Sequence, residues 1–248
     1  VLYINGEYWG LYFLRPDLDP AVLGATLGTG PERITIAAGS GGRSSPAFAP
    51  VREYMADHDA SSAEARAWVE NEVDLDSFID WVTVQIALAN ADIGNCMYWR
   101  PDGGRWRWIL FDLDLAMSSP GVDSVAKVLG EGADVLPPDV QAVWDWMSQH
   151  EPYREALLLR ASRLYQEEFA AQTAEDQLDA LLEPLETEFH RDNERWNRTR
   201  RWGREVENLR AFFRDRPVAV RRHYVRFFAL EVEEADRLFP ASPVATRE

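Results

Sequence analysis

The sequence predicts an α+β fold in which short β-hairpins lead into a mostly helical C-terminal half. Two turn signals, Asn5-Gly6 and residues 101–104, each separate segments that have a period-2 apolar pattern. From Asp139 onward the apolar residues recur at helical spacing instead. With 248 residues and 46% hydrophobic content, the chain can bury the core of one large domain or two small ones.

The N-terminal part is predicted to be short and β-rich. A β-hairpin is expected over residues 1–14, followed by a helix from Asp19-Pro20 to Leu27 and a strand over residues 33–37. Residues 39–46, which are rich in glycine and serine, are predicted to form a loop. Because the chain begins inside its first predicted strand, we expect it to be a fragment that lacks an N-terminal part of its domain.

The middle of the chain is predicted to place a helix before a second hairpin. Residues 49–72 are helical with interruptions, and Asp74 or Asp76 caps the next helix, which ends near residue 90. Its apolar stripe is Phe78, Val82 and Ile86. Strands follow over residues 96–100 and 105–111, and the second strand has Trp106, Trp108 and Leu110 on one face.

The remaining chain is predicted to be irregular as far as about residue 138 and helical afterwards. The breaks between these helices are expected near Pro152, Thr173, residues 201–203 and Pro217, and after Phe239.

The charge of the chain excludes some classes of partner. The net charge is −16, so the surface repels nucleic-acid phosphates, and no nucleic-acid partner is expected. No stretch of about 18 apolar residues occurs, so no membrane span is expected. Lys127 is the only lysine of this acidic protein, and Cys96 is its only cysteine.

Three side chains that carry oxygen are predicted to converge at the open end of the second hairpin. With a four-residue turn at 101–104, Asn95 falls opposite Leu110. Asn95 and Asp112 therefore lie at the same end of the hairpin, two residues out of register. Asp92 lies just before the hairpin, at the end of a helix. Taken alone, Asp92 has a second interpretation as a loop residue and Asn95 as a turn residue. For Asp112 a functional role is favoured, because an acid that follows an apolar strand is costly without a partner.

This set of side chains suits one class of metal. Two carboxylates and an amide are hard oxygen donors of the kind that bind Mg²⁺ together with substrate phosphates, and no His or Cys cluster supports zinc. Protein kinases use the same order of parts: an Asp for the substrate hydroxyl, an Asn for metal, a hairpin, and a second Asp for metal. The order Asp92, Asn95, hairpin, Asp112 matches it.

Several motifs together resemble the CotH (spore coat protein H) kinase family. They are a strand-pair motif, a helix start, the Asp and Asn of the loop, a strand end and C-terminal helix motifs: residues 5–12 (NGEYWGLY), 74–80 (DLDSFID), Asp92 with Asn95, 108–114 (WILFDLD), 189–191 (FHR) with Arg195-Trp196, and 209–216 (LRAFFRDR). The resemblance covers nearly the whole chain, and the first and fourth of these motifs together are quite specific.

The resemblance implies a divergent protein-kinase-like fold and an activity. It implies a single domain over residues 1–248, with a remnant of a small β lobe (1–48), a mostly helical catalytic lobe (49–240) and a tail (241–248). It implies a kinase that uses ATP and Mg²⁺ or Mn²⁺ and phosphorylates Ser or Thr of a protein substrate. It also implies an extracellular, cell-envelope or spore-surface location.

Roles follow for the named residues. Asp92 is the candidate catalytic residue, and Asn95 and Asp112 are the candidate metal ligands. Asp114, which has a second interpretation as a helix N-cap, and Arg43, beside the glycine-rich loop, are the candidates for nucleotide binding.

A second interpretation is a catalytically decayed surface or envelope module that kept the kinase-like fold. Family members often carry a Tyr-Lys pair on the strand that here reads Ile34–Ala38, and no lysine is present there. The spacing from Asp92 to Asn95 is about two residues shorter than the family pattern. For this reason we expect the chain, if it is active, to be a weak kinase.

Overall fold

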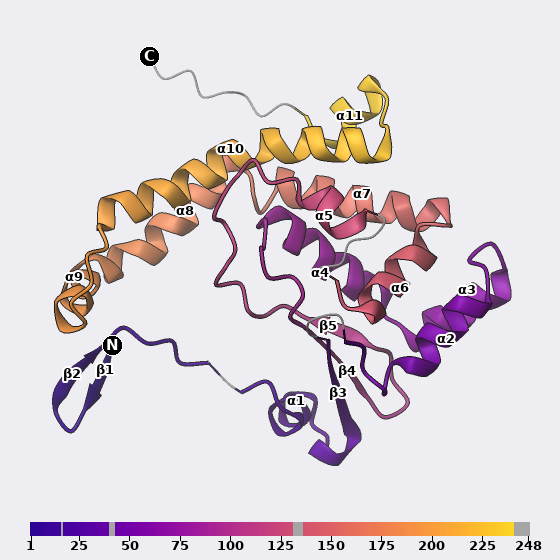
Figure 1. Cartoon of the computed structure of the whole chain (residues 1–248), viewed down its shortest axis with the longest axis horizontal. Helices are drawn as coiled ribbons and strands as arrows, with labels where there is room; N and C mark the ends of the chain where they lie inside the picture. The colour runs from indigo at the N-terminus through magenta and orange to yellow at the C-terminus, as the bar shows by residue number, and fades with distance from the viewer. Residues whose placement is uncertain (16, 40–42, 131–135, 241–248) are drawn as a thin grey trace.

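The computed structural model describes residues 1–15, 17–39, 43–130 and 136–240 (Figure 1). Its strands are short and its helices dominate the C-terminal half, as the sequence predicts. In chain order, with η for short 3-10 helices, the elements are β1 (Leu2–Ile4), β2 (Glu7–Gly10), α1 (Pro20–Leu27), η1 (Pro31–Arg33), β3 (Ile34–Gly39), α2 (Ala49–Asp57), α3 (Ala63–Glu72), α4 (Leu75–Ala87), β4 (Cys96–Pro101), β5 (Arg107–Ile109), α5 (Ser124–Leu129), α6 (Pro138–Met147), α7 (Glu151–Gln166), α8 (Ala171–Leu182), η2 (Glu183–Leu185), α9 (Glu186–Arg195), α10 (Trp202–Phe228) and α11 (Val232–Leu238).

The predicted fold class is confirmed. The two sheets are small and antiparallel, and no strand follows β5 within the described residues. None of the helices in the described ranges combines the length and the apolar character that crossing a membrane requires.

The second hairpin belongs to a three-stranded sheet of order β3-β4-β5. Its register differs by one residue from the prediction, because Met97 pairs with Ile109 and Trp99 with Arg107. The cause lies outside the hairpin. The backbone of Trp106 donates to Glu72 O at 2.8 Å and accepts from Asp74 N at 2.9 Å, in a parallel bridge to the segment between α3 and α4. Trp106 is therefore not paired with β4, and β5 covers only Arg107–Ile109 of the predicted strand 105–111.

Helix α4 lies at the centre of the core. Asp74 caps its start by accepting a hydrogen bond from Ser77 N at 3.3 Å, as one of the two predicted caps. The predicted stripe of Phe78, Val82 and Ile86 is completely buried. The helix packs against α7 on one side and against β5 and α5 on others, as Figure 1 shows. An aromatic cluster covers the facing side of the sheet: Phe48, Tyr98, Trp106 and Trp108.

The N-terminal hairpin forms as predicted around Asn5-Gly6, where both residues have positive φ (51° and 83°), as a two-residue hairpin turn requires. It docks on α9 and not on the three-stranded sheet (Figure 1). The second strand ends at Gly10 and not at Leu14. The reason is that Asp192 Oδ1 accepts from Leu11 N at 3.0 Å, which takes the backbone out of strand pairing.

The break expected near Pro152 is confirmed, because α6 ends at Met147 and α7 begins at Glu151; Pro152 lies in the first turn of α7, where its missing N–H costs nothing. Three other expectations are corrected. Helix α5 lies inside the segment expected to be irregular. Thr173 lies inside α8, so the break falls before Ala171. Pro217 does not interrupt α10, because burial of one face of this 27-residue helix outweighs the loss of a single hydrogen bond.

The end of α10 carries a strained residue that gives a stability test. Ala229 is exposed and adopts the left-handed conformation (φ 51°, ψ 43°), and its N–H donates to Val225 O. Glycine adopts this conformation without a Cβ penalty, so Ala229→Gly should raise the free energy of unfolding by up to about 1 kcal/mol. Chemical denaturation measures the change.

The matched control is Ala211→Gly in the interior of the same helix. It should lower the free energy of unfolding by about 0.5–1 kcal/mol, because glycine is disfavoured there. Destabilisation by both substitutions would contradict the assignment of strain to Ala229.

Candidate functional site

The loop after α4 is built to present Asp92. Asn90 is 3% exposed; its amide donates to Gln85 Oε1 at 2.9 Å, and its Oδ1 accepts from Asp92 N at 3.1 Å. An Asn side chain that bonds to the backbone two residues later forms an Asx-turn, which fixes the chain direction at that point. The backbone of Asp92 is thus tied to the end of a buried helix, and its carboxyl group is half-buried.

Asn95 joins the two candidate carboxylates. Its Nδ2 donates to Asp92 Oδ2 at 2.8 Å and to Asp112 Oδ2 at 3.3 Å. The structure therefore brings together the three residues that the hairpin pattern selected, although the strand register is shifted by one. We call Asp92, Asn95 and Asp112 the candidate metal site.

Asp112 has an uncommon backbone conformation. Its φ is +57°, in the left-handed region that non-glycine residues seldom adopt. Such conformations cost roughly 1–3 kcal/mol and persist only where surrounding contacts hold them. The surrounding contacts are present here: Ala91 N donates to Leu115 O at 3.3 Å, and Met117 N donates to Leu88 O at 2.8 Å. Backbone hydrogen bonds therefore connect the segment before Asp92 to the segment after Asp112.

The donors of this site fit Mg²⁺ or Mn²⁺ better than a transition metal that prefers nitrogen or sulfur. The site offers two carboxylates and one amide, and no group of three or more His, Cys, Asp or Glu side chains capable of holding a metal occurs in the described ranges. Mg²⁺ commonly uses one or two carboxylates and leaves its other positions to water and substrate phosphates. Asp112, through its carboxylate, and Asn95, through its amide oxygen, are the residues that would hold it, with the Asp92 carboxylate beside them.

The two residues predicted to bind nucleotide are both exposed. Asp114 is exposed two residues after Asp112, and Arg43 is exposed at the start of the described segment 43–130. Residues 40–42 of the glycine-rich loop beside Arg43 lie outside the described residues. The roles of Arg43 and Asp114 stay predictions.

Two basic residues that sequence reasoning did not select bind the backbone that leads into the site. Lys127 lies on α5, and its Nζ donates to Ala91 O at 3.0 Å, next to Asp92. Arg216 on α10 is 1% exposed and donates to the carbonyls of Ile86 and Ala87 at the end of α4. The rarity of lysine in this chain was a signal that could have drawn attention to Lys127. No local signal marks Arg216, which lies in a helix rich in arginine.

A buried carboxylate anchors the segment after the glycine-rich loop. Asp139 is completely buried and accepts hydrogen bonds from Ser45 N at 2.6 Å, from Tyr98 Oη and from Arg52, with which it also forms an ion pair. Burial, and then the hydrogen bond to Asp139, raises the pKa of Tyr98, so its hydroxyl remains a donor. This network joins the Arg43–Ser45 segment to β4, the strand that begins directly after Asn95.

Comparison with protein families gives one match. A family model described as CotH kinase protein matches residues 48–220, which include Asp92, Asn95, Asp112 and Asp114. The chain belongs to the CotH kinase family. The match begins at α2 and ends within α10, so it contains the whole candidate metal site and both of its basic supports. No curated protein and no solved structure matches the chain.

The network around Asp139 gives a stability test. Asp139→Ala leaves the guanidinium of Arg52, the Tyr98 hydroxyl and Ser45 N without their acceptor, so we expect a loss of roughly 3–5 kcal/mol in the free energy of unfolding. Urea denaturation measures the loss.

The control is Asp102→Ala, which removes an ion pair with Arg33 whose two side chains are about 60% exposed. Exposed ion pairs contribute roughly 0–1 kcal/mol, so this variant should be close to the unmodified protein. Equal effects of the two substitutions would show that Asp139 is not the anchor.

Proposed function

We propose that this member of the CotH kinase family is a metal-dependent protein kinase that transfers the γ-phosphate of ATP to a Ser or Thr hydroxyl of a protein. Membership of the family indicates a kinase-like function. The observation that carries the finer proposal is the contact of one amide, Asn95 Nδ2, with the carboxylates of both Asp92 and Asp112.

The residues divide into two roles. Asp112 and Asn95 would hold Mg²⁺ or Mn²⁺, and a divalent cation bound there would neutralise phosphate charge of ATP. Asp92 orients the acceptor hydroxyl and accepts its proton as the oxygen attacks the γ-phosphorus. The half-buried position of Asp92 suits this role, because Asn90 fixes its backbone and Asn95 fixes its carboxyl group, and the residue is still reachable from solvent.

Positioning is what this site supplies. Phosphoryl transfer needs little covalent chemistry from the protein, since catalysis comes from alignment and from neutralised phosphate charge. The backbone hydrogen bond between Ala91 and Leu115, together with the Asx-turn at Asn90, supports such alignment. Arg43 and Asp114 are the proposed contacts to the nucleotide.

One observation favours the alternative of a decayed binding module. Strand β3, which pairs along its length with β4, carries no basic residue between Ile34 and Gly39. A cationic side chain that grips the phosphates is therefore not supplied by this strand. Under this alternative, ATP and Mn²⁺ have no joint effect on the protein.

Two substitutions test the division of roles. Asp112→Ala should weaken Mn²⁺ binding in the presence of ATP by at least about 10-fold, because it removes a metal ligand. Asp92→Asn keeps an acceptor for Asn95 Nδ2 but removes the charge. It should leave Mn²⁺ affinity within about twofold and lower phosphotransfer by roughly 10²-fold or more. Electron paramagnetic resonance measures bound Mn²⁺, and labelled ATP measures transfer to casein and to the chain itself.

The control is Asp102→Ala, an exposed carboxylate at the tip of the β4–β5 turn, which should behave as the unmodified protein. Equal loss of Mn²⁺ affinity in the Asp92 and Asp112 variants would refute separate roles. If the wild-type chain does not bind Mn²⁺ together with ATP and transfers no phosphate, the decayed module is supported instead.

A further inference from the structure

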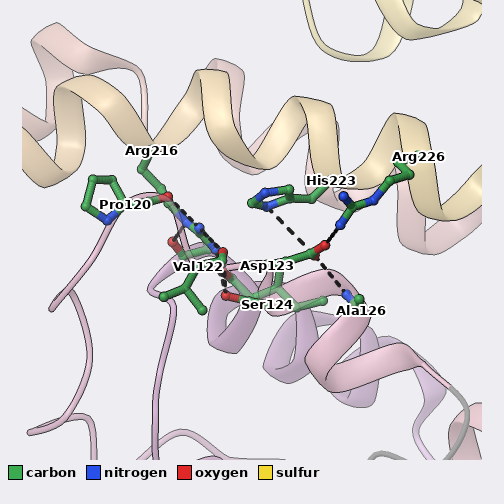
Figure 2. Close-up of polar contacts among 10 residues, drawn as sticks. Pro120, Val122, Asp123, Ser124, Ala126, Arg216, His223 and Arg226 are labelled. Carbon is green, nitrogen blue, oxygen red and sulfur yellow. Dashed lines mark hydrogen bonds and ion pairs between the residues drawn. The ribbon is translucent and has the colours of Figure 1, made fainter.

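Helix α10 contacts the segments on both sides of the candidate metal site through one buried guanidinium, that of Arg216. Arg216 donates to five acceptors, namely four backbone carbonyls and one hydroxyl: Ile86 O, Ala87 O, Pro120 O, Val122 O and Ser124 Oγ. Figure 2 shows the side chain reaching from α10 toward residues 120–124 at the start of α5. The acceptors come from three places in the chain, so a single side chain joins α4, α5 and the loop before α5.

These acceptors flank the candidate metal site in sequence. Ile86 and Ala87 form the last turn of α4, from which the chain runs directly to Asp92. Pro120, Val122 and Ser124 follow the strand end that carries Asp112. Arg216 therefore holds the segment that enters the site together with the segment that leaves it.

Helix α5 connects the Arg216 contacts to the Asp92 loop. Arg216 is bonded to Ser124 at its start, and Lys127, one turn later, donates to Ala91 O at 3.0 Å. Asp123 caps the helix by accepting from Ala126 N at 3.0 Å and forms an ion pair with Arg226. Figure 2 shows these contacts between α5 and α10.

The residues on α10 share one face of the helix. Arg216, His223 and Arg226 are spaced by seven and three residues, which places them on one side. His223 Nδ1 lies 3.8 Å from Asp123 Oδ1. Burial, and then the neighbouring charges of Arg216 and Arg222, lowers the pKa of His223, so the ring is neutral at pH 7 and adds no charge to this interface.

The chemistry of the Arg216 contacts points to alignment as their role. All five acceptors are neutral, and no acid forms an ion pair with Arg216 within the described ranges. Burying a charge in this way is costly, and a core packed with apolar side chains would be cheaper. A planar guanidinium does what an apolar side chain cannot do, since it fixes several carbonyls in set directions at once.

We propose that Arg216 is a positioning residue for phosphoryl transfer, which sets Asp92 relative to Asp112 by clamping the end of α4 to the start of α5, with Lys127 as the second clamp. This inference rests on the proposed kinase function. It adds that α10, far from the site in sequence, determines the alignment of the site.

Arg216→Met and Arg216→Ala test the clamp. Both should lower kcat per folded molecule by about 10²-fold, the effect of small misplacements of reacting groups, while the KM for ATP and the affinity for Mn²⁺ stay within about threefold. Guanidinium chloride at low millimolar concentration should restore part of kcat to Arg216→Ala, which leaves a cavity, and none to Arg216→Met, which fills it. Arg214→Met, an exposed arginine of the same helix, is the control and should leave kcat unchanged.

A milder variant keeps the test valid if the Arg216 variants do not fold. Lys127→Met removes one contact of a partly exposed side chain, so its melting temperature should be unchanged and its kcat about 10-fold lower. If the Arg216 and Lys127 variants melt at lower temperatures but keep full kcat per folded molecule, the residues are only structural and the inference is wrong. If the unmodified chain transfers no phosphate, the proposed function fails, and the inference fails with it.

Discussion

A buried helix needs partners for the carbonyl groups of its last turn, and in this protein that requirement shapes the site. Helix α4 is buried along most of its length, so its last carbonyls cannot rely on water. Leu88 N donates to Val84 O, Asn90 N donates to Gln85 O, and Ala89 N donates to Ile86 O. Arg216 provides a second donor for Ile86 O and the donor for Ala87 O. Met117 N donates to the next carbonyl, that of Leu88.

The same contacts produce the candidate metal site. Satisfying the end of α4 draws in a side chain from α10 and the backbone from the segment after β5. Asp92 lies just after the end of α4, and Asp112 lies just before the segment that contains Met117. Both carboxylates accept a hydrogen bond from Asn95. The site thus depends on how α4 ends. Loss of the hydrogen bonds at this end would make the distance between the Asp92 and Asp112 carboxylates more variable.

Local signals made much of the fold predictable. Asn5-Gly6 set the first hairpin, Asp19 capped α1 and Asp74 capped α4, because each of these depends on residues only a few positions away. The convergence of Asp92, Asn95 and Asp112 was also predictable, since a hairpin with a short turn must bring its two ends together.

The missed features depend on contacts between residues far apart in sequence. The register slip arises because the Trp106 backbone bonds to residues 72–74, more than 30 positions earlier. The acceptors of Arg216 lie 92–130 positions from it. In sequence Arg216 is one arginine among many on a charged helix, and Lys127 lies in a segment without a clear pattern. Only the assembled core shows that one is buried and that the other reaches the Asp92 loop.

The N-terminal motif has a structural explanation that separates it from the chemistry. Arg191 and Arg195 of α9 lie over the rings of Tyr8 and Trp9, at 3.9 and 4.8 Å from their centroids. Gly10 is required where it stands, because a Cβ there would come within 2.4 Å of Asp192 Oδ1.

Two motifs that looked independent in the sequence, the N-terminal strand pair and the Phe189–Trp196 helix, are therefore the two sides of one contact. Their residues are accounted for by docking of the hairpin on α9. Apart from Arg43, the residues proposed for phosphate chemistry lie between the end of α4 and the start of α5, and Arg216 contacts both ends of this segment.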